Sequence, residues 1–435
     1  MNRKFYNTLL NWKNDNLMTP LMVVGARQIG KTYIIEQFCK ENFKENITIN
    51  LDKQERIRDV FEKSIDPINI IKGIEIVLDK KIDIDNTVIF FDEIQVSERA
   101  ITSLKYFCED EKPYKIICAG SLLGVKLSRF KSSFPVGKVI IKDMYPMDFE
   151  EFLMAIGKEL WIEAIRENYC TLKPLIIHDE LLELYRTYLC IGGMPQCIKN
   201  FINNNNDILF YKTDIVNSII KSYIADMGKY INNKTEAIKI EAVYNSIPKQ
   251  LAKEDKKFQY TIIDKKARKK YYESAIDWLV ASSMVCKCNL LNIKSLPLTP
   301  PIKFYENLNS FKFYLNDVGI LTYLSKFKYN DIILDEDMIH KGILTENYVA
   351  NQFRMNEIPL YYWKGTRNAE VDFIIHNEDG IIPVEVKSSD NTQSKSLKTY
   401  IETFNPKYAI RISSKNFSFN NNIKTIPLYA VFCIK

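Results

Sequence analysis

One segment, GARQIGKT at residues 25–32, constrains the fold more than any other part of the chain. It lies between a short apolar run at residues 21–25, typical of a buried strand, and KTYIIEQFCKENF at residues 31–43, typical of an amphipathic helix. Gly25, Gly30, Lys31 and Thr32 fit the P-loop pattern, in which backbone N–H groups surround phosphate at a helix N-terminus. The sequence therefore predicts a P-loop carried by a strand–loop–helix unit.

The P-loop pattern also assigns individual roles. Lys31 would reach the β- and γ-phosphates of ATP, and the Thr32 hydroxyl would be a ligand of Mg²⁺. The predicted ATP-binding residues are Ser121 and the eight residues of the loop: Gly25, Ala26, Arg27, Gln28, Ile29, Gly30, Lys31 and Thr32.

The ends of two further apolar strands supply the rest of the predicted ATPase site. TVIFFDE at residues 87–93 ends in Asp92, which would reach Mg²⁺, and Glu93, which would polarise the attacking water. Ser121 ends the next strand, where a short polar side chain would sense the γ-phosphate. It could equally cap the helix that follows. Arg129 is a candidate arginine finger toward a neighbouring subunit, which would imply a homo-oligomer.

The order of apolar segments predicts four domains. Residues 1–150 alternate strands and helices, as in a parallel α/β sheet covered on both faces. Residues 151–230 are mainly helical. Residues 231–335 read as helix, helix and two strands, the layout of a winged helix, and residues 336–435 return to an α/β pattern.

Composition indicates where in the cell the protein is expected and the redox state of its cysteines. No apolar run approaches the ~20 residues that span a bilayer, and Asn11, Lys13, Asn14 and Asp15 interrupt any secretory segment, so we expect a cytoplasmic protein without membrane contact. The nine cysteines show no zinc spacing and are expected to be reduced packing residues.

A basic cluster at residues 265–270 is a candidate contact surface for DNA. Lys265, Lys266, Arg268, Lys269 and Lys270 could contact phosphates and give sequence-tolerant binding through the winged-helix segment. A solvated helix face, or a domain that only braces its neighbour, would explain the cluster as well.

The whole chain resembles a family of prokaryotic AAA+-type ATPases whose C-terminal half is a domain of unknown function. The resemblance rests on the shared order of GARQIGKT, FFDE, CAGS, YPMDFEEF, GGMP, FYLNDVGI, GILTENYV and EVDF…VEVK. It departs from the family at Gly137–Lys138, where Gly-Arg is common, so the basic residue that contacts phosphate in trans is in question.

Four C-terminal residues resemble the active site of the PD-(D/E)xK nuclease fold: Glu346, Asp372, Glu385 and Lys387. The resemblance implies that Asp372 and Glu385 hold one or two Mg²⁺ or Mn²⁺ ions, with Glu346 in support, and that Lys387 positions water or stabilises developing charge. Charged residues on an amphipathic edge strand would give the same pattern.

Three hypotheses about function follow. The first is a Mg²⁺-dependent ATPase coupled to a nuclease-like domain that acts on DNA. The second is a regulatory or interaction protein that ATP switches without DNA cleavage. The third, a metabolic kinase, is disfavoured because no compact lid is evident and the C-terminal carboxylates would be unexplained.

Overall fold

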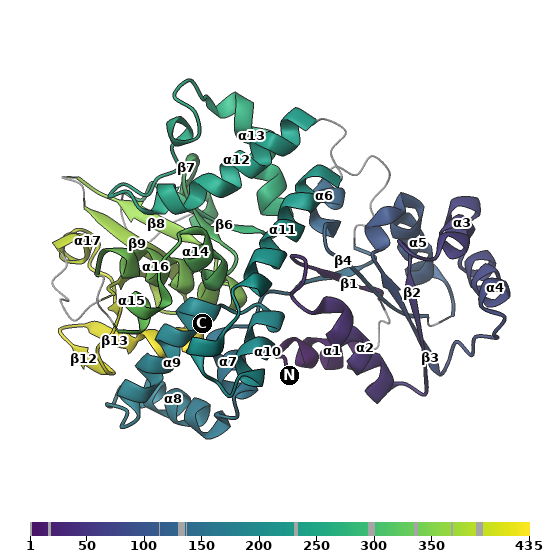
Figure 1. Cartoon of the computed structure of the whole chain (residues 1–435), viewed down its shortest axis with the longest axis horizontal. Helices are drawn as coiled ribbons and strands as arrows, with labels where there is room; N and C mark the ends of the chain where they lie inside the picture. Colours follow the sequence, from purple (N-terminus) through teal and green to yellow (C-terminus); the bar gives the residue numbers. More distant parts are fainter. Residues whose placement is uncertain are drawn as a thin grey trace. The chain divides into compact units, whose positions relative to one another are not determined.

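The computed structural model describes residues 2–15, 19–112, 114–128, 135, 137–229, 234–294, 301–334, 338–366, 369–388 and 395–435. The chain divides into two compact units (Figure 1). The N-terminal unit comprises residues 2–145 and 281–283, and the C-terminal unit comprises residues 146–280 and 284–435.

A five-stranded parallel sheet forms the centre of the N-terminal unit, in the order β2-β3-β4-β1-β5. The predicted parallel α/β sheet is confirmed. Because β4 lies between β1 and β3, the carboxyl ends of these three strands are neighbours at one edge of the sheet. The strands are β1 (Leu21–Val24), β2 (Glu45–Asn50), β3 (Thr87–Asp92), β4 (Lys115–Gly120) and β5 (Ile140–Asp143).

Helices cover both faces of this sheet, which explains the continuous apolar strands. Alternate strand residues such as Met22, Ile49 and Phe91 form one hydrophobic cluster with α3, α4 and α5. The helix after the P-loop, α2, packs against β2, β3 and β4. The helices are α1 (Phe5–Asn14), α2 (Lys31–Asn42), α3 (Glu55–Lys63), α4 (Pro67–Leu78), η1 (Ile94–Val96), α5 (Glu98–Glu109) and α6 (Leu123–Ser128).

The C-terminal unit is built on one eight-stranded mixed sheet, in the order β12-β13-β11-β10-β9-β8-β6-β7. The strands are β6 (Val285–Leu291), β7 (Glu306–Leu315), β8 (Tyr361–Lys364), β9 (Glu370–Asn377), β10 (Gly380–Val386), β11 (Ala409–Ser413), β12 (Ser418–Asn420) and β13 (Ile423–Pro427). The structure thus joins strands that the sequence assigned to two domains, 231–335 and 336–435, because β6 pairs in parallel with β8.

Most of the helices found in the described ranges belong to this C-terminal unit (Figure 1). They are α7 (Phe149–Ala155), α8 (Glu159–Thr171), α9 (His178–Ile191), α10 (Pro195–Asn203), η2 (Ile208–Phe210), α11 (Asp214–Lys229), α12 (Lys234–Leu251), η3 (Tyr260–Ile262), α13 (Lys269–Ala281), η4 (Ile302–Tyr305), α14 (Val318–Leu324), α15 (Tyr329–Ile333), α16 (Met338–Met355), α17 (Lys395–Phe404) and η5 (Leu428–Cys433). The predicted order of helix, helix, strand, strand is present as α12, α13, β6 and β7, but this strand pair is part of the larger sheet.

Three of the motifs noted in the sequence meet in the core of this unit. The buried Asp317 carboxylate accepts a hydrogen bond from the Gly193 N–H at 2.6 Å, and the Gly193 carbonyl accepts one from the Met147 N–H at 2.7 Å. A Cβ at residue 193 would overlap the Met147 carbonyl oxygen. GGMP, YPMDFEEF and FYLNDVGI are therefore packing motifs that fix one another.

Two further expectations concern the chain as a whole. All nine cysteines are free thiols, and most are buried. Within the described ranges, no helix has the length and hydropathy that a membrane span requires.

Candidate functional site

The P-loop connects β1 to α2 in a conformation that depends on glycine. Gly25 and Gly30 have φ angles of 150° and 92°, which L side chains rarely adopt. A Cβ at residue 25 would also overlap the Met144 carbonyl oxygen. The Lys31 ammonium donates to the carbonyl oxygens of Gly25 at 2.9 Å and Ala26 at 2.7 Å. The lysine predicted to contact phosphates is therefore held against its own loop.

Arg3, which was not predicted from the sequence, braces the P-loop. Its guanidinium donates to the Ile29 carbonyl at 2.8 Å and to the Tyr145 carbonyl at 2.7 Å, and the residue is buried. The loop and the chain that leaves β5 are thereby tied together. The partners are 26 and 142 residues away in the chain, so no local pattern indicates them.

The expected magnesium ligands lie together at the carboxyl edge of the sheet. The Thr32 hydroxyl is 3.2 Å from each carboxylate oxygen of Asp92, and the Asn50 amide donates to Asp92 Oδ2 at 3.1 Å. Burial and the charge of Glu93 raise the Asp92 pKa, although hydrogen bonds from Thr32 and Asn50 oppose the shift. A buried carboxylate beside a hydroxyl is a hard oxygen donor set that fits Mg²⁺. Asn50 was not predicted.

Glu93 directly follows β3 and lies beside Ser121, as the strand order requires. The Ser121 hydroxyl donates to Glu93 Oε2 at 3.5 Å, and the side-chain amide of Gln95 donates to the same oxygen. Glu93 has φ 53° and ψ 40°, which is a left-handed conformation unusual for a residue other than glycine. The sheet therefore brings Ser121 and Glu93 together, and it adds Gln95, which sequence reasoning missed.

The candidate arginine finger cannot be placed in the same way, because Arg129 lies outside the described residues. Lys138, at the position where the resembled family commonly has arginine, forms an ion pair with Glu109 at 3.2 Å. Both side chains are substantially exposed.

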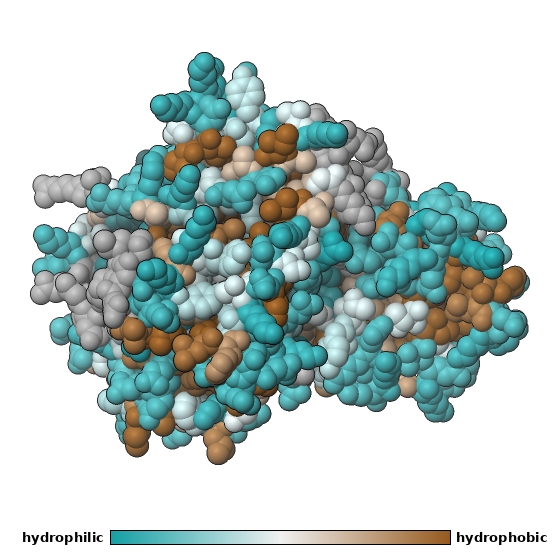
Figure 2. Space-filling view, in the orientation of Figure 1, coloured by the Kyte–Doolittle hydropathy of each residue, from teal (hydrophilic) through white to brown (hydrophobic). Residues whose placement is uncertain are grey.

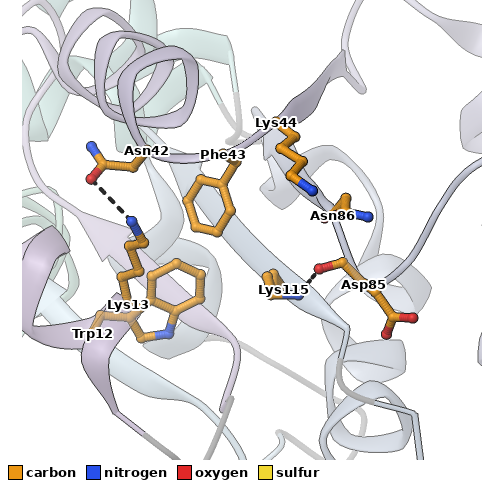
Figure 3. Close-up of a pocket in the computed structure, with 8 residues that line it drawn as sticks. All are labelled: Trp12, Lys13, Asn42, Phe43, Lys44, Asp85, Asn86 and Lys115. Atoms are coloured by element: carbon orange, nitrogen blue, oxygen red, sulfur yellow. Dashed lines mark hydrogen bonds between the residues drawn. The ribbon is translucent and has the colours of Figure 1, made fainter.

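A separate cavity of about 310 Å³ lies at the amino ends of the strands of the same sheet (Figure 3). Its lining comes from the end of α1 and from residues that precede or begin β2, β3 and β4. The P-loop follows the carboxyl end of β1 and Asp92 is the last residue of β3, so this cavity is distinct from the nucleotide site. It is lined by Trp12, Lys13, Asn42, Phe43, Lys44, Asp85, Asn86 and Lys115.

In the C-terminal unit, Asp372, Glu385 and Lys387 lie close together. β9 and β10 are antiparallel, with Val384 opposite Phe373, so continuing this register places Glu385 opposite Asp372. Asp372 Oδ2 accepts a hydrogen bond from the Val386 N–H at 2.8 Å, and the Lys387 ammonium pairs with Glu385 at 2.7 Å. Three of the four predicted residues therefore converge.

Glu346, on α16, is engaged by residues that were not predicted. Its Oε1 accepts hydrogen bonds from Lys312 at 3.1 Å and from Tyr314 at 2.5 Å, while its Oε2 pairs with Lys256. Burial alone would raise the Glu346 pKa, but Lys256 and Lys312 outweigh it and lower the pKa. Two lysine ammonium groups thus surround the Glu346 carboxylate. Because they would repel a metal cation, Glu346 is poorly suited to bind one.

Lys312 is the centre of a longer chain of alternating charges. It is fully buried, and its ammonium also contacts Glu370 at 2.6 Å. Glu370 lies 4.0 Å from Lys364, which pairs with Asp255 at 3.1 Å. Asp255 and Lys256, which are adjacent in the loop after α12, form the two ends of this chain of charges.

Asp372 has the electrostatics of a crowded carboxylate. Burial, reinforced by the charges of Glu385 and Glu346, raises its pKa to about 8 against the opposing effect of Lys312 and Lys256. Across the described residues, no three His, Cys, Asp or Glu side chains are grouped so that they could hold a metal ion. Asp372 and Glu385 remain as a pair of candidate oxygen ligands, without Glu346.

The basic segment is exposed. Lys265, Lys266, Arg268, Lys269 and Lys270 all face solvent where the chain enters α13, and Lys269 pairs with Glu273 at 3.5 Å. Figure 2 shows hydrophilic side chains projecting beyond α12 and α13 at the top of the view. The segment is accessible to a phosphate backbone, and equally to water.

Models of known domain families match three successive parts of the chain. That of an AAA domain matches residues 18–153, and those of two domains of unknown function match residues 182–331 and 341–431. An uncharacterized protein of Methanocaldococcus jannaschii is 22% identical over 415 residues, which cover 92% of this chain and 82% of the relative.

Two solved structures match this chain at 12% sequence identity. A Walker-type ATPase of Pyrococcus abyssi has a TM-score of 0.44 and covers 74% of this chain and 95% of its own. The ORC2 protein of Aeropyrum pernix, in ADPNP–ADP complexes, has a TM-score of 0.37 with 77% and 94% covered. The family match and the site geometry lead to the same conclusion: residues 18–153 are a P-loop ATPase domain of the AAA type.

Proposed function

We propose that the N-terminal unit hydrolyses ATP with Mg²⁺ and that hydrolysis controls the C-terminal unit. The observation that carries the first part is the meeting of Thr32 and Asp92 at 3.2 Å, beside the P-loop and next to Glu93. Thr32 and Asp92 would hold Mg²⁺, which when bound neutralises charge on the β- and γ-phosphates.

The residues of this chain then have separate tasks. The Lys31 ammonium exchanges the carbonyl oxygens of Gly25 and Ala26 for phosphate oxygens when ATP binds. Glu93 orients a water molecule in line with the γ-phosphate. As the new O–P bond forms, the water proton passes to Glu93 and the bond between the γ-phosphorus and the ADP oxygen breaks. Ser121, which donates to Glu93, would sense the γ-phosphate and pass its presence to the glutamate.

ATP turnover by two variants tests this assignment. Lys31→Ala should lose nucleotide affinity and turnover, whereas Glu93→Gln should bind ATP and fail to hydrolyse it. Lys40→Ala is a matched control because Lys40 is an exposed lysine of the same helix. Turnover by Lys31→Ala and Glu93→Gln at the rate of the Lys40→Ala control would refute the chemistry.

A metal-dependent nuclease in the C-terminal unit is a second candidate function. The convergence of Asp372, Glu385 and Lys387 on neighbouring strands favours it. Asp372 and Glu385 would hold one Mg²⁺ or Mn²⁺ ion, and the basic segment before α13 would contact DNA. The engagement of Glu346 by two lysines favours the rival function, an ATP-switched regulatory protein that cuts no DNA.

These two roles give different results with DNA. A nuclease should nick plasmid DNA with Mg²⁺ or Mn²⁺, and Asp372→Ala and Glu385→Ala should abolish the nicking. A regulatory protein should leave DNA intact under the same conditions. DNA that stimulates ATP turnover with a steep dependence on salt would support a DNA partner in either case.

Assembly of several copies is part of the proposal, because an arginine finger acts on a neighbouring subunit. Arg129→Ala should retain ATP binding and lose turnover. Mixing it with the Glu93→Gln variant should restore turnover, since each inactive subunit then supplies what the other lacks. Wild-type turnover by Arg129→Ala would exclude this role.

A further inference from the structure

Gln95 is a buried amide that no step of the proposed hydrolysis uses. It lies in η1, directly after β3, and is 1% exposed. Its amide nitrogen donates to Glu93 Oε2. Its amide oxygen lies against Gly120 at the end of β4, where a Cβ would overlap it. The Gln95 side chain is therefore wedged between the ends of the two strands that carry Glu93 and Ser121.

The local backbone is shaped so that the side chains of residues 93 and 95 meet. Glu93 is left-handed, and the 3-10 turn that follows is closed by a hydrogen bond from the Val96 N–H to the Glu93 carbonyl at 3.2 Å. Such a conformation is rare for a residue with a side chain and is retained where the surrounding structure imposes it. Here the imposed turn brings a donor to the carboxylate of the predicted base.

We propose that Gln95 is the positioning residue for Glu93 in ATP hydrolysis, an inference that rests on the proposed ATPase function. The amide of Gln95 and the hydroxyl of Ser121 both hold Oε2. Glu93 Oε1 is then the oxygen that faces the attacking water and takes its proton. Gly120 is required because any larger residue at the end of β4 would displace the amide.

The unpaired half of the Gln95 amide offsets what its hydrogen bond to Glu93 contributes to stability. Among the described residues, its buried amide oxygen has no hydrogen-bond partner. A buried polar atom without a partner opposes folding, and an apolar side chain of the same shape avoids that penalty. Methionine matches glutamine in length, so Gln95→Met should fold as well as the wild type and lose only the hold on Glu93.

Steady-state ATP turnover, nucleotide affinity and thermal unfolding of full-length variants test the proposal. Gln95→Met should lower kcat by about 10- to 100-fold, the loss typical of one hydrogen bond to a charged group, with KM and Tm unchanged. Gln37→Met is a matched control, because Gln37 also donates to a glutamate, Glu41 at 3.0 Å, but on an exposed part of α2. It should leave kcat unchanged.

A second variant covers the case in which Gln95→Met fails to fold. Gln95→Glu puts two carboxylates in contact, so turnover should be nearly lost at pH 8. It should recover toward pH 5.5, where the pair shares one proton and that proton restores the hydrogen bond. The wild type should not gain activity over this range. A purely structural role would not produce this inverted pH profile.

The outcomes distinguish failure of the role of Gln95 from failure of the proposed ATPase function. Loss of turnover in Glu93→Gln together with wild-type kcat in Gln95→Met, or a Gln95→Glu profile that parallels the wild type, overturns the role of Gln95 alone. Full turnover in Glu93→Gln would instead overturn the proposed function beneath it. Reduced kcat with unchanged KM and an inverted profile supports both.

Discussion

Replacing the buried Lys312 by methionine tests how the C-terminal unit tolerates its internal charges. Lys312 is fully buried and contacts Glu346 at 3.1 Å and Glu370 at 2.6 Å. Lys312→Met keeps the length of the side chain and removes the ammonium. Both carboxylates then lose a cation in a medium where water cannot replace it, and removal of one partner from such a pair typically costs about 3–5 kcal/mol.

The remaining contacts place the expected effect at the lower end of that range. Glu346 keeps Lys256 and Tyr314, and Glu370, 19% exposed, keeps Lys364 at 4.0 Å. We therefore expect Lys312→Met to lower the free energy of unfolding of this unit by about 3 kcal/mol. This is a large part of the ~5–15 kcal/mol by which most domains are stable.

Urea unfolding followed by tryptophan fluorescence measures this loss selectively. Trp161, Trp278 and Trp363 belong to the C-terminal unit and only Trp12 to the other, so the signal reports mainly the unit of interest. Lys364→Met is the matched control, since its 34% exposed side chain forms a surface pair that should contribute less than about 1 kcal/mol. Equal midpoints for Lys312→Met and Lys364→Met would refute the reasoning.

Three further outcomes follow from the structure. The pKa of Asp372 is about 8 in the folded state and about 3.9 in the unfolded state, so the folded state binds the extra proton between these pH values. The stability of the wild type should therefore fall as pH rises toward 8. Urea midpoints of Asp372→Asn should depend less steeply on pH than those of the wild type between pH 5 and 9. Gly193→Ala should destabilise the C-terminal unit by about 1–3 kcal/mol in the same assay, since the new methyl overlaps the Met147 carbonyl; an unchanged midpoint would contradict the packing described. Thr32→Val keeps the shape and removes the hydroxyl next to Asp92, so the Mg²⁺ concentration for half-maximal ATP turnover should rise about tenfold or more, which about 1.4 kcal/mol of affinity represents. An unshifted magnesium titration would remove Thr32 from the metal site.

The nucleotide site was predictable from sequence because its elements are local. A P-loop is defined by residues that are consecutive, and its flanking strand and helix show in the hydrophobic pattern. The carboxyl ends of parallel strands then bring Asp92 and Ser121 to the same edge. The conformation of Glu93 could not be predicted in this way, because nothing in FFDEIQ indicates a left-handed glutamate. The contact between Gln95 and Glu93 depends on that conformation, so Gln95 was not predicted.

The charged cluster of the C-terminal unit shows where sequence reasoning stops. FKFYL predicts a strand, and its alternation puts Lys312 and Tyr314 on one face, but a lysine between two phenylalanines does not reveal its partner. That partner, Glu346, is 34 residues away on a helix. The motif predicts that Glu346 supports the metal held by Asp372 and Glu385, whereas its surroundings show two ammonium groups and a phenol.

The parallel pairing of β6 with β8 limits how this protein can be divided or recombined. The two domains of unknown function, at residues 182–331 and 341–431, contribute strands to one continuous sheet. A polypeptide that began near residue 341 would present β8 as a bare edge, an open template for aggregation. Gene fusion or exchange between relatives should therefore carry both segments together, as a single inherited module with two recognisable halves.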